Sequence, residues 1–214
     1  MTAPRLVVHV PHASVVVPDD ITPELARTAE GLEHELLVMT DRHTDALLAL
    51  PPDVATTVTF PVSRRVVDPE RFVDDADEPM ATKGMGAIYE RTAAGELLRR
   101  RCTPEERRRL LARFYEPHHA ALSAAVQAAL DAHSTCLLLD AHSFPSRPLP
   151  YEEDQREDRP DICIGTDPRH TPAELKVAAA RVRGGRIGAS RSTDPSPGHS
   201  SRCRSTGEIF GCVR

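Results

Sequence analysis

The chain has 214 residues, of which 40% are apolar and only 4% aromatic, so we expect one globular domain with an aliphatic core. A net charge of −5 offers no basic surface for nucleic acid, and no stretch approaches the ~20 apolar residues of a membrane helix. The five cysteines form no C-x-x-C pair and argue against a disulfide scaffold; together with the lack of a signal sequence they predict a cytoplasmic protein.

Strand-like and helix-like segments alternate along the chain, which predicts an α/β fold. The first strand covers residues 5–10, and Pro11 ends it because proline has no N–H for the ladder. Thr22-Pro23 opens a helix, and a longer amphipathic helix covers residues 33–50. The later elements are strands at 54–60, 136–140 and 161–165, helices at 103–115, 118–133 and 172–182, and loops at 72–88 and 146–160.

Two of the predicted strands end in a histidine followed by a small residue and a serine. His12 follows the first strand and His142 follows the strand at 136–140. Functional groups of α/β proteins gather past the carboxyl ends of strands, so we expect both imidazoles to meet there, with Asp41 or His43 from the helix over 33–50. Two imidazoles, one carboxylate and an open fourth position make a zinc-hydrolase ligand set. The spacing fits no short zinc motif. The alternative is that these histidines only cap the strand ends or form hydrogen bonds with loops.

Two arginines follow the strand at 54–60, namely Arg64 and Arg71. The guanidinium fork suits a substrate carboxylate, since it donates two parallel hydrogen bonds. The alternative, which we favour for Arg71 taken alone, is a solvated basic loop paired with the aspartates that follow. His118 and His119 stand at a helix start, where they could be metal ligands, groups that support ligands, or surface cap residues.

Six short motifs occur in an order that resembles the N-formylglutamate amidohydrolase family. They span about residues 6–167 and read Val-Pro-His12-Ala-Ser, Thr-Asp41-Arg-His43-Thr-Asp45, Ser63-Arg64-Arg-Val-Val-Asp68-Pro-Glu-Arg71, Gly84-Met-Gly86-Ala-Ile-Tyr89, Tyr115-Glu-Pro-His-His119 and Asp140-Ala-His142-Ser143. The resemblance implies a three-layer α/β/α sandwich around a central mixed sheet, similar to zinc carboxypeptidases and aspartoacylases. It also implies zinc-dependent hydrolysis of N-formyl-L-glutamate to formate and glutamate, a step of histidine breakdown.

The resemblance implies the metal-site histidines His12 and His142 and the substrate arginines Arg64 and Arg71, whereas Asp41, Ser143, Asp140 and His119 are chosen from their positions in this sequence. The expected Zn²⁺ ligands are His12, Asp41 and His142, the expected substrate-binding residues are Arg64, Arg71 and Ser143, and the expected catalytic residues are Asp140 and His119. Glu70 departs from the family, because asparagine is expected there and an acid beside an anion-binding arginine would weaken substrate binding. The expected partner is a small N-acyl amino acid, bound by a monomer or homodimer without nucleic acid or membrane.

The last segment, residues 190–214, differs in composition from the single domain predicted for residues 1–189. It is rich in Ser, Arg, Gly and Pro, which predicts disorder. Back-translation favours a frameshift instead: Thr193 onward, written in GC-rich codons and moved by two bases, reads as a Pro-flanked apolar stretch and a strand start. The chain would then lack the final strand and the general-base glutamate that the resemblance leads us to expect. An impaired family member that only binds metal or carboxylate is therefore the alternative function.

Overall fold

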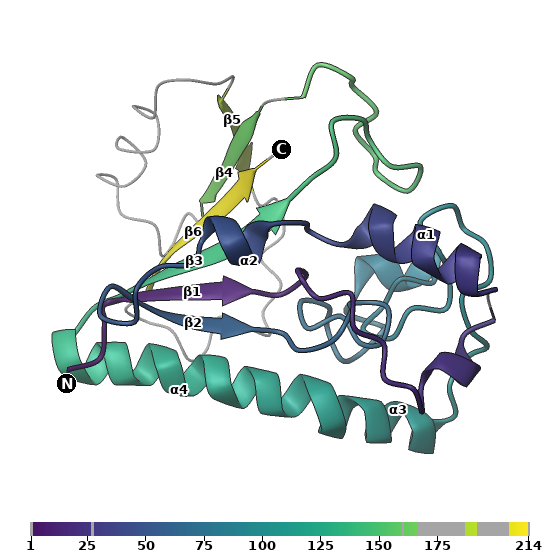
Figure 1. Cartoon of the computed structure of the whole chain (residues 1–214), viewed down its shortest axis with the longest axis horizontal. Helices are drawn as coiled ribbons and strands as arrows, with labels where there is room; N and C mark the ends of the chain where they lie inside the picture. Colours follow the sequence, from purple (N-terminus) through teal and green to yellow (C-terminus); the bar gives the residue numbers. More distant parts are fainter. Residues whose placement is uncertain (1, 27, 160, 167–186, 192–205, 214) are drawn as a thin grey trace.

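The computed structural model of the chain describes residues 2–26, 28–159, 161–166, 187–191 and 206–213. Six strands in these ranges form one sheet in the order β2-β1-β3-β6-β4-β5 (Figure 1). Their bounds are β1 Leu6–Val10, β2 Ala55–Thr59, β3 Cys136–Ser143, β4 Ile162–Thr166, β5 Ile187–Arg191 and β6 Thr206–Val213. Neighbouring strands are parallel except β4 and β6, so the sheet is mixed.

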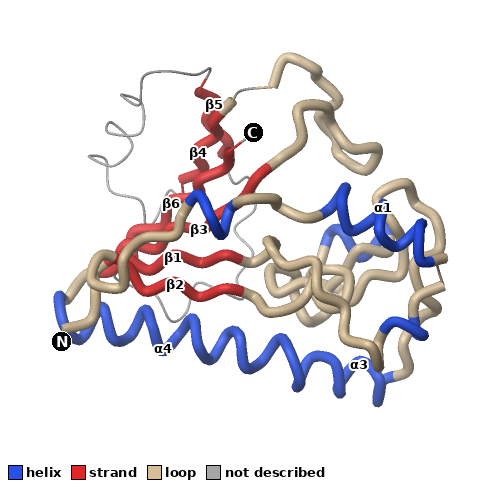
Figure 2. Tube along the Cα trace, viewed as in Figure 1, coloured by secondary structure: helices blue, strands red, loops and turns tan. Residues whose placement is uncertain are grey.

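The bounds of the helices are η1 Thr22–Glu24, α1 Ala29–Met39, α2 Thr44–Leu47, η2 Pro79–Lys83, α3 Pro104–Leu110, η3 Leu111–Tyr115 and α4 Glu116–His133 (Figure 2). Three of these helices begin at a side chain that caps the first turn, namely Thr28 before α1, Glu78 before η2 and Thr103 before α3. Thr103 and Glu106 form the reciprocal capping box at the start of α3. The two predicted helices of this region form one run, because η3 is a π-turn in which the Glu116 N–H bonds to the Leu111 carbonyl.

The predicted helix over 33–50 is interrupted, which corrects the sequence-based expectation. The backbone leaves α1 at Thr40 in an extended conformation, and His43 adopts a left-handed conformation with φ 68° before α2 begins. The Asp41 N–H donates to the carbonyl of His12 at 3.0 Å instead of continuing the helix. This break places Asp41 in a turn beside the end of β1, not on a helix face.

The two faces of the sheet bury different apolar clusters. Val7 of β1 and Cys136 of β3 pack against Val126 and Ala129 of α4, which runs along one face (Figure 1). On the opposite face a cluster around Val8 includes Leu48, which follows α2. The described helical cover of that second face is limited to this short region, so the three-layer sandwich stays a prediction.

The segment between β2 and α3 is irregular, as predicted, but it forms a core of its own. Met85, Ala87, Ile88 and Tyr89 are almost fully buried there. This segment lies beyond the carboxyl ends of β1 and β2 (Figure 2). It therefore supplies a rigid wall to the edge of the sheet where the predicted site residues emerge.

The tail contributes a central strand, which differs from the predicted disorder. Residues 206–213 form β6, paired in parallel with the whole of β3 and antiparallel with β4. The predicted helix at 172–182 and residues 192–205 lie outside the described residues. None of the helices in the described ranges has both the length and the apolarity that crossing a bilayer requires.

Candidate metal centre

His12 and His142 meet at one edge of the sheet. His12 follows the end of β1, and His142 lies in the last part of β3. These two strands are adjacent and parallel, and the ring centroids of the two histidines lie 5.2 Å apart. His12 is 1% exposed, so its imidazole is held inside the protein rather than at a solvated strand end. The sequence pattern thus correctly brings the two imidazoles together.

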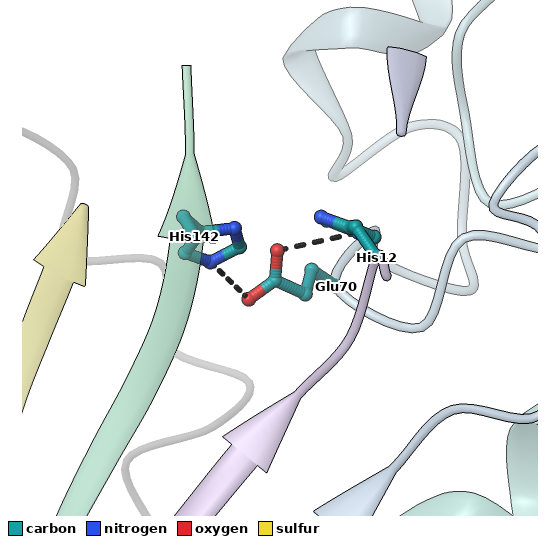
Figure 3. A group of neighbouring side chains, drawn as sticks. All are labelled: His12, Glu70 and His142. Carbon is teal, nitrogen blue, oxygen red and sulfur yellow. Dashed lines mark hydrogen bonds and ion pairs between the residues drawn. The ribbon is translucent and has the colours of Figure 1, made fainter. Parts of the chain in front are cut away.

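Glu70 lies between the two imidazoles (Figure 3). Its Oε1 is 3.1 Å from Nε2 of His142, and its Oε2 is 3.4 Å from Nε2 of His12. One ligand atom from each of these residues lies within 4.8 Å of the others. The structure therefore gathers His12, Glu70 and His142, whereas the sequence predicts Asp41 as the carboxylate ligand and marks Glu70 as a departure from the family.

Asp41 takes a supporting position behind His142. Its Oδ2 accepts a hydrogen bond from Nδ1 of His142 at 2.8 Å, and this bond leaves Nε2 facing Glu70. Burial alone would raise the pKa of Asp41, but contacts with His12 and His142 and the charge of Arg64 hold that pKa well below its usual range. Asp41 is thus a permanent carboxylate that orients an imidazole, as ligand-supporting groups do in metalloproteins.

Asp68 supports His12 in the same way. Its Oδ1 lies 2.9 Å from Nε2 of His12, and the carboxylate is fully buried. The other ring nitrogen, Nδ1 of His12, has no hydrogen-bond partner among the described residues. Burial and the Arg64 charge oppose protonation of His12, but Asp68 and Glu70 together raise its pKa. A buried imidazole crowded by carboxylates favours a bound cation, either a proton or a metal.

The two predicted carboxylate-binding arginines are already engaged inside the protein. Arg64 donates from Nε at 3.1 Å and from Nη2 at 2.8 Å to Oδ2 of Asp68. Arg71 lies 3.7 Å from the same Asp68 oxygen and 3.5 Å from Oε1 of Glu78. The hydroxyl of Tyr89 also donates to Asp68, at 2.6 Å. Of the two arginines, only Arg64 lines the cavity described below.

The other predicted site residues, Ser143, His119 and Asp140, lie at three different positions around the site. Ser143 lines the cavity, whereas His119 donates from Nε2 to the Pro69 carbonyl at 2.8 Å and stacks on Tyr115. This bond holds the backbone next to Glu70, which makes His119 a positioning residue here. Oδ1 of Asp140 lies 3.6 Å from Nε2 of His142, beneath the group of His12, Glu70 and His142.

Two further histidines, His9 and His118, are buried near the site; the sequence assigns no role to His9 and leaves three alternatives open for His118. His9 of β1 contacts His118 of α4, with their Nε2 atoms 2.8 Å apart. Burial and the neighbouring imidazoles of His9 and His119 lower the pKa of His118 to about 3, so this ring is neutral near neutral pH. The sequence carries only a weak sign of a role for His9. His9 lies two residues after Val7 and therefore on the same face of the strand, where an apolar residue is usual.

A cavity of about 540 Å³ opens on the group of His12, Glu70 and His142. Its walls include apolar residues of α1, such as Leu37 and Met39, and Phe144 from beyond β3. Arg42 also lines it, from the turn between α1 and α2. A cavity of this size suits a small molecule.

Comparisons with known proteins identify the family of the chain and relatives of its fold. A model of the N-formylglutamate amidohydrolase family matches residues 4–190. The solved N-formylglutamate amidohydrolase of Ralstonia eutropha JMP134 is similar, with a TM-score of 0.77 and 23% identity, over 100% of this chain and 83% of that chain. A gene product of Agrobacterium tumefaciens is similar with a TM-score of 0.67 and 19% identity, over 99% of this chain and 81% of that chain.

No curated protein gave a significant match. At these low identities the two structures support the fold, while the family match covers most of the chain and includes every motif of the site. The chain belongs to the N-formylglutamate amidohydrolase family.

Proposed function

We propose that this chain is a zinc-dependent amidohydrolase that cleaves an N-acyl amino acid, such as N-formyl-L-glutamate, to formate and the amino acid. The single observation that carries the proposal is the group of His12, Glu70 and His142 on the wall of a 540 Å³ cavity. Two imidazoles and a glutamate are the protein ligands of catalytic zinc in thermolysin and carboxypeptidase A. Membership of the family supports the hydrolase activity.

The residues present fit a zinc ion. Asp41 holds Nδ1 of His142, which leaves Nε2 of that ring facing Glu70. Nε2 of His12 contacts both Asp68 and Glu70, whereas its Nδ1 makes no hydrogen bond with the described residues and lies 3.6 Å from Oδ2 of Asp41. A buried ring nitrogen without a hydrogen bond is the kind of atom that a metal satisfies. When bound, zinc supplies a Lewis acid and a water whose pKa is near 7.

The surrounding side chains hold and orient the substrate in this proposal. Arg42 is exposed on the cavity wall, and no described residue forms an ion pair or side-chain hydrogen bond with it. We therefore propose Arg42 as the group that meets the substrate carboxylate. Arg64 remains close to the same cavity but keeps its two bonds to Asp68. Ser143 offers a hydroxyl near the amide.

An impaired family member is the second candidate, and the register of β6 favours it. Glu208 pairs with Leu138, while Cys212 pairs with His142 at the edge of the sheet. Glu208 therefore stands four residues, roughly 13 Å, before that edge. It does not occupy the position of a general base beside the metal. The chain would then bind zinc and carboxylate with little turnover.

Zinc content and formate release test the proposal together. Purified protein is analysed for metal by mass spectrometry and then assayed for formate with N-formyl-L-glutamate and with formylated neutral amino acids. We expect at least one zinc per chain and formate release, and in His12→Ala and His142→Ala we expect the loss of one zinc and of formate release. The control His34→Ala, an exposed residue of α1, should keep both. Zinc without formate supports the impaired member, and unchanged zinc in both variants contradicts the ligand set.

The metabolic setting and the cellular location of the reaction are also proposals. Histidine breakdown as its setting comes from the family resemblance, and a cytoplasmic location comes from the cysteine pattern. Growth on histidine of a strain in which this gene is deleted would test the first. Unimpaired growth, with no formylglutamate accumulating, would contradict it.

A further inference from the structure

A second group of potential metal ligands lies directly beneath the first. It consists of His9, Glu70 and Asp140, each with one ligand atom within 4.8 Å of the others. His9 and Asp140 are partners in the register of β1 and β3, so the sheet itself sets their separation. Glu70 belongs to both groups, and its Oε1 and Oε2 contact His142 and His12 of the first group.

Asp140 carries an unsatisfied oxygen at the centre of this second group. The residue is only 8% exposed, and its Oδ1 has no hydrogen-bond partner among the described residues. Nδ1 of His9 lies 3.0 Å away and Nε2 of His142 lies 3.6 Å away, within ion-pair distance of Oδ1 but off the direction of a hydrogen bond. A buried carboxylate oxygen in this state costs free energy unless a cation or water meets it.

His118 contacts one ring nitrogen of His9 and leaves the other on the side of Asp140. The Nε2 atoms of the two rings lie 2.8 Å apart, so one ring donates and the other accepts. When His9 donates through Nε2–H, its Nδ1 carries a lone pair directed to the side of Asp140. This is the same support that Asp41 gives to His142, in which one ring nitrogen is held and the other is left for a ligand bond.

The charge of the site also exceeds what one divalent ion neutralises. Two guanidinium groups, Arg64 and Arg71, meet five linked carboxylates: Asp41, Asp68, Glu70, Glu78 and Asp140. With neutral imidazoles, five negative and two positive charges leave −3 in a largely buried region. A single divalent cation leaves −1, whereas a second one leaves room for an anionic substrate group.

We propose that His9, Asp140 and Glu70 bind a second divalent metal ion, with Glu70 bridging it to the ion held by His12 and His142. The site is then dinuclear, with ions about 3.5–4 Å apart as in other two-metal hydrolases. This inference rests on the proposed function only because Glu70 is a ligand of both ions. It concerns metal binding and does not depend on turnover.

Metal stoichiometry is the test. The full chain is stripped with a chelator, titrated with Zn²⁺ by calorimetry, and analysed by mass spectrometry after gel filtration. We expect two ions per chain in the wild type and one ion in His9→Phe, because phenylalanine fills the same volume without Nδ1. The matched control His34→Phe changes an exposed residue and should keep two ions. One ion in the wild type, or two ions in His9→Phe, overturns the proposal.

Cobalt provides a measurement that needs no variant. Two Co²⁺ ions bridged by Glu70 are magnetically coupled, so the paramagnetic resonance signal per ion should fall when the second equivalent is added. A signal that grows in proportion to added Co²⁺ overturns the bridge. The variant His12→Ala tests the first site separately. Suppose that the wild type binds one ion, that His12→Ala loses this ion and that His9→Phe keeps it. This result refutes the second site and leaves the proposed function standing.

Discussion

Asp41 Oδ2 and His142 Nδ1 are joined by a hydrogen bond of 2.8 Å across 101 residues of sequence. This bond decides which nitrogen of His142 faces Glu70, because a ring whose Nδ1–H is held by a carboxylate presents Nε2. It also explains why the chain leaves the helix at Thr40. A continued helix would carry Asp41 away from the end of β1.

The first prediction concerns this bond. Asp41→Asn should lower zinc affinity by roughly 10–100-fold, since loss of a group that orients a ligand usually has that effect. The protein should still fold, because the amide oxygen can accept the same hydrogen bond. Calorimetric titration of the chelated protein with Zn²⁺ measures the change. Asp53→Asn, on an exposed turn, is the control, and an unchanged affinity in Asp41→Asn would show that the bond does not tune the metal.

The second prediction separates the two arginines that line the cavity. Arg42→Gln should raise KM by roughly ten- to a hundredfold with little change in zinc content, since charge-assisted hydrogen bonds contribute about 1.5–3 kcal/mol. Arg64→Lys should instead lower stability, because lysine cannot reproduce the two N–H bonds to Asp68. Formate-release kinetics and thermal unfolding distinguish these effects. Arg147→Gln, exposed beyond β3, should change neither.

The opposite pattern would be informative. A large KM effect in Arg64→Lys with an unchanged melting temperature would return the carboxylate-binding role to Arg64. Wild-type KM in Arg42→Gln would remove Arg42 from the substrate site. A KM can be measured only if the chain turns over substrate. For an inactive chain, the affinity for formylglutamate measured by calorimetry replaces the KM.

The third prediction concerns acid stability of the metal-free protein. Burial opposes ionisation of Asp68, but the charges of Arg64 and His12 hold its pKa well below the ordinary value of about 3.8. A carboxylate with a depressed folded-state pKa contributes stability above its unfolded-state pKa, and this contribution disappears as the pH falls through the folded-state value. The free energy of unfolding should therefore fall steadily below about pH 4.

Asp68→Asn tests this dependence. The variant should lose about 3–5 kcal/mol at neutral pH, because it leaves buried Arg64 without its partner. Its loss of stability toward acid should be shallower than that of the wild type. Urea unfolding with a chelator present, at pH 7 and at pH 3, measures both quantities. Equal slopes in the two proteins would mean that Asp68 is not the group responsible, and Asp19→Asn is the exposed control.

The fourth prediction concerns the tail. Residues 206–213 do form a strand, but Glu208 stands far from the catalytic edge in the register with β3. We still expect the segment from Thr193 onward to be out of frame, which resequencing of the gene decides. A chain with the frame restored should melt higher, by about 2–4 °C for each kcal/mol gained, and should release formate faster. An intact frame together with full activity of the chain as printed would refute this prediction.

Elements with local signals could be predicted from the sequence alone. The apolar run before His142, the proline after β1 and the capping box at Thr103 each depend on neighbours within a few residues. β1 and the start of α3 lie close to their predicted bounds, whereas β3 continues beyond residue 140 through His142 to Ser143. Parallel pairing of β1 and β3 then follows from the α/β pattern, and it is enough to bring His12 and His142 together.

Only the tertiary structure decided which carboxylate joins them. Glu70 reaches the histidines from an irregular segment whose path depends on buried contacts of Tyr89 and on the bond from His119 to the Pro69 carbonyl. Asp41 became a supporting group because a backbone bond to His12 replaced a helical one. Such choices are made by contacts between residues tens of positions apart, and no periodicity or spacing in the sequence carries that information.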